Sequence, residues 1–337
     1  MIKNKVIRTV CYFTDNPNTE DVEKTKAIVA RLEAIGYKIQ TKRMCAPFSK
    51  GNMLQSVPED TLKSMGELTF EEAREELPQF FASNDLSFNV DLTDTEIATK
   101  HVDLLFEIIQ TDPSKTFNFT FTFNNASSSP YFPSAKYERN GFAIGLQPTD
   151  LAAGCTTLEE WLAEMKKCWD EIATLFENDP DFLGIDSSIA PIGGGDGSFV
   201  HFIKRIGYGF EQSATTNIYT TITNFIKTNN PKPVGLCGMM LPCLEDDELA
   251  AEYDKGNFSI ERNIFLSLHS GLGIDTYPIG IDENHDRVVE ILQLVQSLSN
   301  KYSKPLSARF VSDGKSRIGQ RSDFQNQYLA DCTILAL

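Results

Sequence analysis

The sequence predicts an α/β protein whose mainly parallel sheet, open or closed into a barrel, is covered by helices. Two observations support this fold class. Segments rich in β-branched and aromatic residues alternate with amphipathic helical patterns along the chain, without an internal repeat or a low-complexity linker. The 337 residues, of which 41% are hydrophobic, also supply enough apolar side chains for a sizeable core. We therefore expect one barrel-like domain over residues 1–337.

The first strand–helix–strand unit is the clearest in the chain. Val6 to Phe13 has the β-branched and aromatic content of a strand, and residues 22–35 carry apolar side chains at helical spacing before Gly36. Residues 37–43 then predict a second strand, in the order that a parallel βαβ unit requires. Residues 46–91 show no clean period, so we expect them to form an elaboration on the surface of the sheet.

Later segments repeat the alternation. Helices are expected at residues 94–112, 157–176, 198–206, 215–226, 248–253, 260–268 and 286–298. Strands are expected at residues 117–123, 182–185, 234–237, 274–279, 306–311 and 329–335. Because helices separate most of these strands, we expect the strands to run mainly parallel.

The charge balance argues against two classes of partner. With 47 acidic and 31 basic side chains the formal net charge is -16, so the averaged field repels phosphate backbones and anionic membrane surfaces. The sequence shows no signal-peptide pattern and no apolar run of about 18 residues. Seven scattered cysteines without a C-x-x-C pair indicate reduced thiols. We expect a cytoplasmic protein that binds a small molecule rather than nucleic acid or a membrane, and a homo-oligomer is compatible with these features.

A glycine-rich loop, Gly193 to Ser198, follows an expected strand and precedes an expected helix. Backbone N–H groups and the helix dipole favour an anion in such a place, so Gly194, Gly195 and Asp196 are candidate ligand-binding residues. The loop does not fit the dinucleotide pattern, because Ser198 stands where the third glycine belongs, and it lacks the lysine of a P-loop. A tight turn that uses the positive φ open to glycine is the alternative.

Three acidic residues and one histidine are candidate catalytic groups. Asp186 and Asp275 stand near strand ends, where functional groups of parallel sheets gather, although each also suits a loop cap. Glu245 begins the acidic run 245–248, which fits either a divalent-metal site or the N-terminus of a solvated helix. His269 follows an expected helix and is a candidate acid–base group. No two histidines have metal-ligand spacing.

Neutral and basic side chains complete the candidate site. Asn124, Ser127 and Ser128 follow an aromatic strand and are suited to orient a small polar ligand, although Asx and Ser turns explain the same residues equally well. Arg8 and Arg309 lie in expected strands and are suited to neutralise a carboxylate or a phosphate.

Five segments of the chain also occur together in the order found in one protein family. They are Ile7 to Val10, Asp186 to Pro191, Gly235 to Asp246, Gly273 to Asp275 and Arg309 to Gly319. Together they resemble the domain of unknown function family 711, most strongly over the second half of the chain. The resemblance implies a fold similar to that of the pyruvate formate-lyase-like glycyl-radical enzymes, which is an α/β barrel of roughly ten strands with a loop entering its centre.

The resemblance does not bring the radical chemistry with it. Glycyl-radical enzymes carry the radical on a glycine in a C-terminal Arg-Val-x-Gly-Tyr segment. In Arg309 to Lys315 the spacing is longer, and Lys315 replaces the expected aromatic residue. Cys237 and Cys243 are more simply explained as buried thiols. We therefore expect the scaffold without a clear radical motif.

The function predicted from these features is that of an enzyme or enzyme-like protein binding a small polar or anionic metabolite at the barrel centre. A non-catalytic metabolite-binding or sensor protein is the first alternative, and a divergent glycyl-radical enzyme is the second. A divalent metal is a candidate cofactor on the strength of the acidic run alone.

Overall fold

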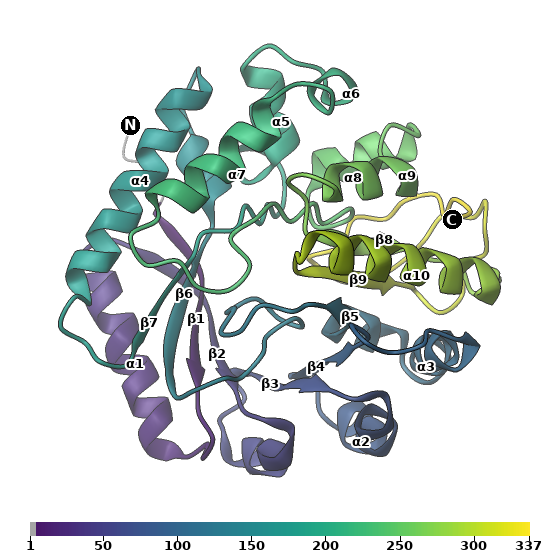
Figure 1. The fold of residues 1–337 in the computed structure, drawn as a ribbon, viewed down its shortest axis with the longest axis horizontal. Coiled ribbons are helices and arrows are strands. Elements are labelled where there is room, and N and C mark those ends of the chain that lie inside the picture. Colours follow the sequence, from purple (N-terminus) through teal and green to yellow (C-terminus); the bar gives the residue numbers. More distant parts are fainter. Residues whose placement is uncertain (1–4) are drawn as a thin grey trace.

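The computed structural model describes residues 5–337, and in this part of the chain nine strands form one sheet (Figure 1). The strands are β1 (Val6–Phe13), β2 (Lys38–Cys45), β3 (Leu62–Leu68), β4 (Leu86–Asp91), β5 (Phe119–Phe123), β6 (Gly141–Leu146), β7 (Phe182–Asp186), β8 (Gly273–Pro278) and β9 (Leu306–Val311). Their spatial order is β7-β6-β1-β2-β3-β4-β5-β9-β8. Strands β1 to β5 form one parallel array, and β6 pairs in parallel with β7, as β8 does with β9. Antiparallel joints β1–β6 and β5–β9 link these groups, which confirms a mainly parallel α/β sheet.

Helices surround the sheet on its outer side (Figure 1). They are α1 (Thr19–Ala34), α2 (Phe70–Ala82), α3 (Thr99–Thr111), α4 (Leu158–Leu175), α5 (Phe199–Arg205), α6 (Phe210–Ser213), α7 (Ile218–Asn229), α8 (Asp247–Asp254), α9 (Ile260–Ser267) and α10 (His285–Tyr302). Short 3-10 helices are η1 (Phe48–Ser56), η2 (Pro113–Asn118), η3 (Pro148–Ala152) and η4 (Gly195–Gly197). None of the helices within residues 5–337 has both the length and the apolar character needed to cross a bilayer.

The sheet is not a continuous closed barrel. Its edge strands are β7 and β8, and residues 233–242 lie between them. This segment forms isolated parallel bridges, Ile185–Pro233 and Ile189–Met239 on the β7 side and Met239–Gly271 and Pro242–Asp275 on the β8 side. Proline lacks the N–H that a ladder needs, which accounts for bridges in place of a tenth strand. A closed barrel of ten strands is therefore not confirmed, and the likeness to pyruvate formate-lyase stays a prediction.

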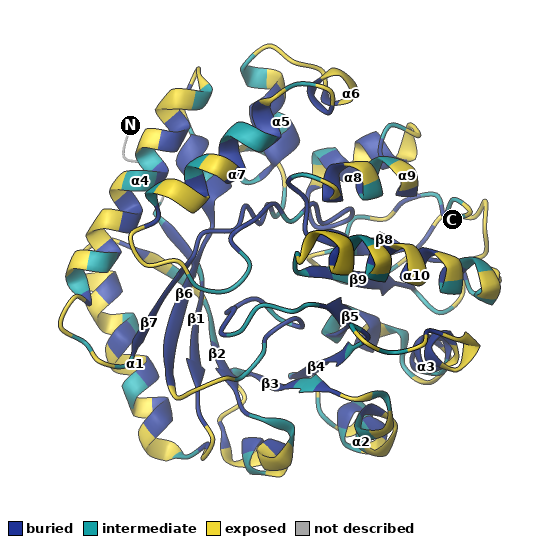
Figure 2. Cartoon of the chain, in the orientation of Figure 1, coloured by how far each residue is buried: buried dark blue, intermediate teal, exposed yellow. Residues whose placement is uncertain are grey.

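The core lies between the sheet and its helices. Figure 2 shows buried residues along the strands and on the inward sides of the helices, with exposed residues on the outer helix surfaces. All residues of β5, β6 and β7 are buried. On α4, Trp161 and Trp169 are fully buried, and Trp161 Nε1 donates a hydrogen bond to the carbonyl oxygen of Pro148 at 2.7 Å. Burial of such large aromatic side chains contributes several kcal/mol each, on the order of 2–3, to the packing of α4.

Residues 46–91 are part of the sheet rather than a surface elaboration. They contain β3, α2 and β4, and both strands occupy interior positions of the sheet. The strand pattern was hidden because β3 carries polar residues, among them Lys63, whose ammonium group pairs with Asp85 at 2.7 Å. The β3–β4 ladder also shifts register, which interrupts the alternation of side chains.

The strands differ from the sequence expectations at three further places. Residues 329–335 form no strand, and their amides donate instead to single acceptors, such as the Tyr253 hydroxyl for Leu335. Residues 141–146 form β6, which the sequence did not predict because this short segment is buried on both faces and has no alternation. The strand expected at residues 234–237 exists only as part of the bridging segment.

A loop between β5 and β6, residues 124–140, turns back into the space that the sheet encloses (Figure 1). Asn89 of β4 holds it, because the Asn89 amide nitrogen donates to the carbonyl oxygens of Pro133 at 2.9 Å and Ala135 at 2.8 Å. The Tyr131 hydroxyl donates to the carbonyl oxygen of Leu146 at 2.7 Å. The loop is thereby fixed to strands on two sides of the sheet.

Candidate functional site

A cavity of about 1310 Å³ begins at the inner face of the sheet beside the loop 124–140 and extends to residues 26–33 of α1 and to the C-terminal segment. Five of the charged side chains that line it come from distant parts of the sequence and concern us first. They are Arg8 on β1, Arg43 on β2, Glu245 after the bridging segment, Asp275 on β8 and Arg309 on β9. Four of these five residues were candidates from the sequence, and Arg43 was not.

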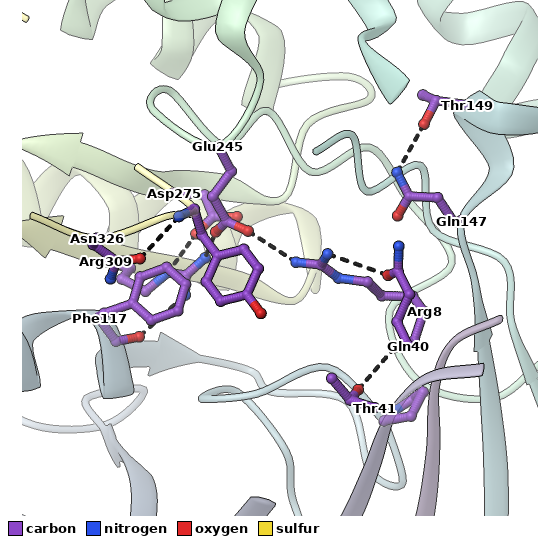
Figure 3. A network of polar contacts seen from close by, with 12 residues as sticks. Arg8, Gln40, Thr41, Phe117, Gln147, Thr149, Glu245, Asp275, Arg309 and Asn326 are labelled. Carbon is purple, nitrogen blue, oxygen red and sulfur yellow. Dashed lines mark hydrogen bonds and ion pairs between the residues drawn. The ribbon is translucent and has the colours of Figure 1, made fainter. Parts of the chain in front are cut away.

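Four of the five charged groups form one network, which Figure 3 shows. Glu245 lies at its middle: Oε1 accepts from Arg309 Nη2 at 2.5 Å, and Oε2 accepts from Arg8 Nη2 at 3.0 Å. Arg309 Nε donates to Asp275 Oδ1 at 2.6 Å, and its Nη1 donates to the carbonyl oxygen of Phe117 at 3.2 Å. Burial works against the charge of Arg309, but attraction to Asp275 and Glu245 outweighs it and raises the pKa of the guanidinium.

Irregularities in two strands direct these side chains into the cavity. The β1–β6 ladder shifts register between Ile7 and Thr9, so Arg8 is an extra residue on β1. In the β8–β9 ladder, Asp275 and the residue after it lie opposite Arg309 alone. Such bulges turn a side chain away from its regular direction and are frequent beside functional sites.

Arg43 is the buried cation that the sequence analysis missed. Its Nε donates to Thr41 Oγ1 at 3.1 Å, its Nη1 donates to the carbonyl oxygen of Pro130 at 3.3 Å, and Cζ lies 4.9 Å from the centre of the Phe132 ring. Among residues 5–337, no carboxylate forms an ion pair with it. Burial, followed by repulsion from Arg8, lowers the pKa of Arg43 to about 10. Arg43 therefore remains charged at neutral pH without a carboxylate partner.

Aromatic side chains and the C-terminal segment form part of the cavity wall. Phe117 stacks on Tyr328 with 6.2 Å between ring centres and an interplanar angle of 7°. Arg309 Cζ lies 5.1 Å from the centre of the Phe117 ring. Residues 324–329 line the cavity beside this stack, and Asn326 lies next to the network in Figure 3. The cavity thus combines aromatic walls with charged groups that can orient a small polar molecule.

Asp186 lies outside the cavity lining and holds three segments together. The carboxylate accepts five hydrogen bonds, from Ser129 Oγ at 2.9 Å, Ser188 N and Oγ at 3.1 and 2.6 Å, Leu236 N at 2.9 Å and Cys237 N at 3.1 Å. Burial raises the pKa of Asp186, and these donors oppose that shift. The catalytic role predicted for Asp186 is not supported by its place, because its oxygens are occupied.

We expect Asp186→Asn to destabilise the protein by about 2–3 kcal/mol, because an amide nitrogen would face donors where a carboxylate oxygen now accepts. Urea unfolding of the variant and of Asp170→Asn, which changes an exposed aspartate on α4, measures this effect. Equal unfolding free energies for the two variants would contradict the conclusion that Asp186 holds the three segments together.

The polar residues expected to orient a ligand do not line the cavity. The Asn124 amide nitrogen donates to Ser299 Oγ at 2.9 Å and Asn300 Oδ1 at 2.7 Å, so it fixes the loop to α10. The Ser128 amide donates to the carbonyl oxygen of Lys136 at 2.9 Å, and Ser127 precedes it in the same turn. From this loop, Tyr131 and Phe132 reach the cavity instead.

The glycine loop binds the protein's own carboxylate. Gly195 N donates to Glu248 Oε1 at 3.1 Å, and Asp196 pairs with Arg205 at 2.5 Å. A Cβ on Gly194 would lie 2.9 Å from a carboxylate oxygen of Asp247. Gly194, Gly195 and Asp196 are thus not among the residues that line the cavity, and internal acids occupy the place expected for a ligand.

The acidic run 245–248 divides between different tasks. Glu245 enters the cavity, whereas Asp246 caps α8 by accepting from the Glu248 and Leu249 amides, each at 3.2 Å. Within residues 5–337 no group of three or more histidine, cysteine, aspartate or glutamate side chains is arranged to hold a metal ion. The helix-start interpretation of the run therefore describes Asp246, and the metal interpretation gains no support.

Asp246 provides a pH-dependent prediction. Burial raises its pKa to about 7, against about 4 in an unfolded chain, so this group favours the native state at low pH and the benefit is lost as the pH rises through 7. Asp246→Asn keeps an acceptor for the helix cap but places an amide nitrogen against the Phe199 amide, which costs stability at every pH. Because the variant does not titrate, we expect its stability relative to the wild type to rise by on the order of 1–3 kcal/mol between about pH 5 and pH 8. Urea unfolding of both proteins at about pH 5 and pH 8 tests this. If the difference in unfolding free energy between the variant and the wild type were the same at both pH values, the raised pKa of Asp246 would be contradicted.

His269 lies at the end of α9, away from the cavity lining. Its Nδ1 contacts Ser270 Oγ at 2.9 Å, and its ring packs edge-on against Phe265. Burial, followed by repulsion from Lys304, lowers the pKa of His269. The fold therefore does not place His269, the predicted acid–base residue, in the charged network.

The seven cysteines are all buried and free, and none of them lines the cavity as described for residues 5–337. Gly314 packs against Pro113, which is not a sulfur-containing neighbour. Burial also raises the pKa of Cys237 to about 11, which keeps the thiol protonated at neutral pH. These observations provide no support for thiyl-radical chemistry at this site.

Residues 69–325 match the sequence model of a family described as Uncharacterised ACR (DUF711). The chain belongs to this family. The match confirms the resemblance seen in the ordered segments of the sequence. In this DUF711 protein the match includes Glu245, Asp275 and Arg309, whereas Arg8 and Arg43 precede it.

Other comparisons add little to the DUF711 assignment. No curated protein matches the sequence significantly. Among solved structures, the Actinobacillus ureae class Id ribonucleotide reductase alpha subunit is similar with a TM-score of 0.43 and 9% identity, over 92% of this chain and 84% of that chain. Similarity at this level contributes no argument about the site of the DUF711 protein.

Proposed function

We propose that this protein binds a small anionic metabolite in the central cavity, with Arg43 as the main anion-binding group. The observation that carries the proposal is the buried guanidinium of Arg43, which faces the cavity with neutral acceptors and an aromatic ring as its neighbours. Burying a cation without a counter-charge is costly, and an anionic ligand would remove that cost. Arg8 borders the same space and can also donate hydrogen bonds to an anion, which would then share this guanidinium with Glu245.

Two versions of this function differ in whether the ligand is transformed. In an enzyme, Glu245 and Asp275 are the candidate acid–base groups, because they are the carboxylates nearest Arg309 in the cavity. In a non-catalytic binding or sensor protein the same carboxylates only hold the arginines in place. The binding version is favoured by one observation, which is that both carboxylates already accept strong hydrogen bonds from Arg309.

A ligand-observed NMR screen tests the proposal. Small carboxylates, sulfonates and phosphates are mixed with the protein beside their neutral amide or alcohol analogues, with and without a chelator. We expect binding of anions only, unaffected by the chelator. Binding restricted to neutral compounds would refute the proposal, and loss of binding with chelator would assign the ligand to a metal instead.

The same sample separates the two versions. Spectra of a bound compound recorded over hours show whether its signals are replaced by those of a product. Conversion of the compound by the wild-type protein but not by Glu245→Gln would support an enzyme. A compound that binds with measurable affinity and whose spectrum does not change would support a binding protein.

A further inference from the structure

The charges at the centre of the cavity do not cancel. Three cations, Arg8, Arg43 and Arg309, face two anions, Glu245 and Asp275, so the group carries one net positive charge at neutral pH. Arg43 and Arg309 are each 7% exposed, and Glu245 is 5% exposed. Solvent therefore screens this surplus only weakly.

The surplus resides at Arg43. Arg8 and Arg309 each contact a carboxylate directly, whereas the hydrogen bonds of Arg43 go to a hydroxyl and a carbonyl oxygen. A ligand that displaced Glu245 from Arg8 would change the pairing but not the sum of charges. The net charge of one is therefore independent of how the side chains rearrange on binding.

The other charged residues of the cavity lining have the opposite balance. Six acids stand there against three lysines, and two of the six already have partners in Lys42 and Lys63. The acids are Glu33, Glu59, Asp60, Asp85, Asp112 and Asp313. Of the three lysines, Lys26 and Lys42 pair with carboxylates, and Lys115 donates to the carbonyl oxygen of Ser83. A second negative charge on a ligand would therefore meet an excess of carboxylates among these residues.

We propose that the ligand of the central cavity is a monoanion, with a single carboxylate or another singly charged acidic group on an uncharged body. This inference rests on the proposed anion-binding function and adds the charge class of the ligand. One negative charge neutralises the buried group, whereas a phosphate monoester or a dicarboxylate leaves a buried negative charge without compensation.

The walls beside Arg43 indicate what the uncharged body contacts. Phe132 lies over the Arg43 guanidinium, and Tyr131 and Phe117 also border the cavity. A body with an apolar or aromatic face can pack on these rings while its acidic group meets Arg43. Benzoate is therefore a suitable probe, and it has close analogues that differ in charge.

The test compares benzamide, benzoate and phenyl phosphate, which carry no charge, one negative charge and close to two at about pH 8. Isothermal titration at constant ionic strength gives their affinities for the wild-type protein. We expect benzoate to bind at least about tenfold more tightly than phenyl phosphate, and benzamide to bind weakest.

Two neutralising variants supply the decisive comparison. Glu245→Gln and Asp275→Asn each raise the net charge of the group from one to two, and we expect each to shift the preference toward phenyl phosphate by about tenfold. Because the two changes lie at different positions, a folding defect in one leaves the other informative. Glu107→Gln removes an acid paired with Arg74 on the outer helices and should keep the wild-type preference.

The outcomes distinguish this inference from the function on which it rests. A wild-type preference for phenyl phosphate, or an unchanged preference in both neutralising variants, would overturn the monoanion class while anion binding stands. If neither benzoate nor phenyl phosphate bound the wild-type protein and the NMR screen also found no bound anion, the proposed function and the inference would fall together.

Discussion

Arg43→Met is expected to raise the stability of the unliganded protein and to abolish anion binding. The arginine is buried without a carboxylate partner, and burial lowers its pKa to about 10, so its charge opposes folding. Methionine fills much of the same space without a charge to desolvate, and we expect a gain of about 1–3 kcal/mol in the free energy of unfolding. The affinity for any anion that the wild-type protein binds should fall by about a hundredfold or more.

Urea unfolding and isothermal titration of the same preparations measure both effects. Arg74→Met is the matched control, because Arg74 pairs with Glu107 at an exposed place on α2 and its loss should change stability by less than about 1 kcal/mol. An Arg43→Met protein that is less stable than wild type and still binds the anion would contradict both parts of the prediction. A gain in stability with loss of binding is the pattern expected where a functional group costs stability.

Glu245→Ala is expected to cause the largest loss of stability of any change in the network. The carboxylate is shared by Arg8 and Arg309, and its removal leaves Arg309 with Asp275 alone and Arg8 with the neutral side chain of Gln40. Breaking a buried ion pair on one side costs about 3–5 kcal/mol, because a charge remains buried without a partner. Asp275→Ala removes one hydrogen bond to a single arginine and should cost less.

A double-variant cycle checks that the loss arises from the network. Arg8→Met combined with Glu245→Ala should be less destabilised than the sum of the two single changes, by about 1 kcal/mol or more. Glu107→Ala provides the exposed comparison, with an expected loss below about 1 kcal/mol. Additive effects of Arg8→Met and Glu245→Ala would show that the two side chains do not share a buried interaction.

Much of the fold followed from local patterns in the sequence. Val6 to Phe13 and the helices α4 and α10 were predicted closely, because each has a strong period and a clear cap or turn beside it. Strand β6 was missed because it is short and buried on both faces, so it has no polar side to reveal its period.

The site was predictable in composition but not in arrangement. Asp275 was selected for its place at a strand end, Glu245 for the acidic run that it begins, and the two arginines because guanidinium groups can neutralise an anion. The arginines are Arg8 and Arg309. The pairing of these four residues joins positions as far apart as 237 residues, and no local pattern fixes such a contact. Arg43 was missed because a residue at the end of an expected strand gives no sign of the face it occupies, and its only trace is the two-residue spacing from Thr41.

The acids that failed to join the cavity illustrate the same limit. Asp186 and Asp246 have the residue type and the strand-end or loop position of functional groups, yet both accept backbone hydrogen bonds that hold segments of the chain together. Local sequence does not distinguish a carboxylate that caps the protein's own backbone from one that remains open to a ligand.

A crystal structure of the protein with the best-binding anion from the screen tests the central claim most directly. We predict that an acidic oxygen of the ligand lies within hydrogen-bond distance of the Arg43 guanidinium, inside the cavity bordered by Phe132 and Glu245. An anion bound elsewhere, for example at the amides of the loop 193–198 with the central cavity holding none, would contradict the account.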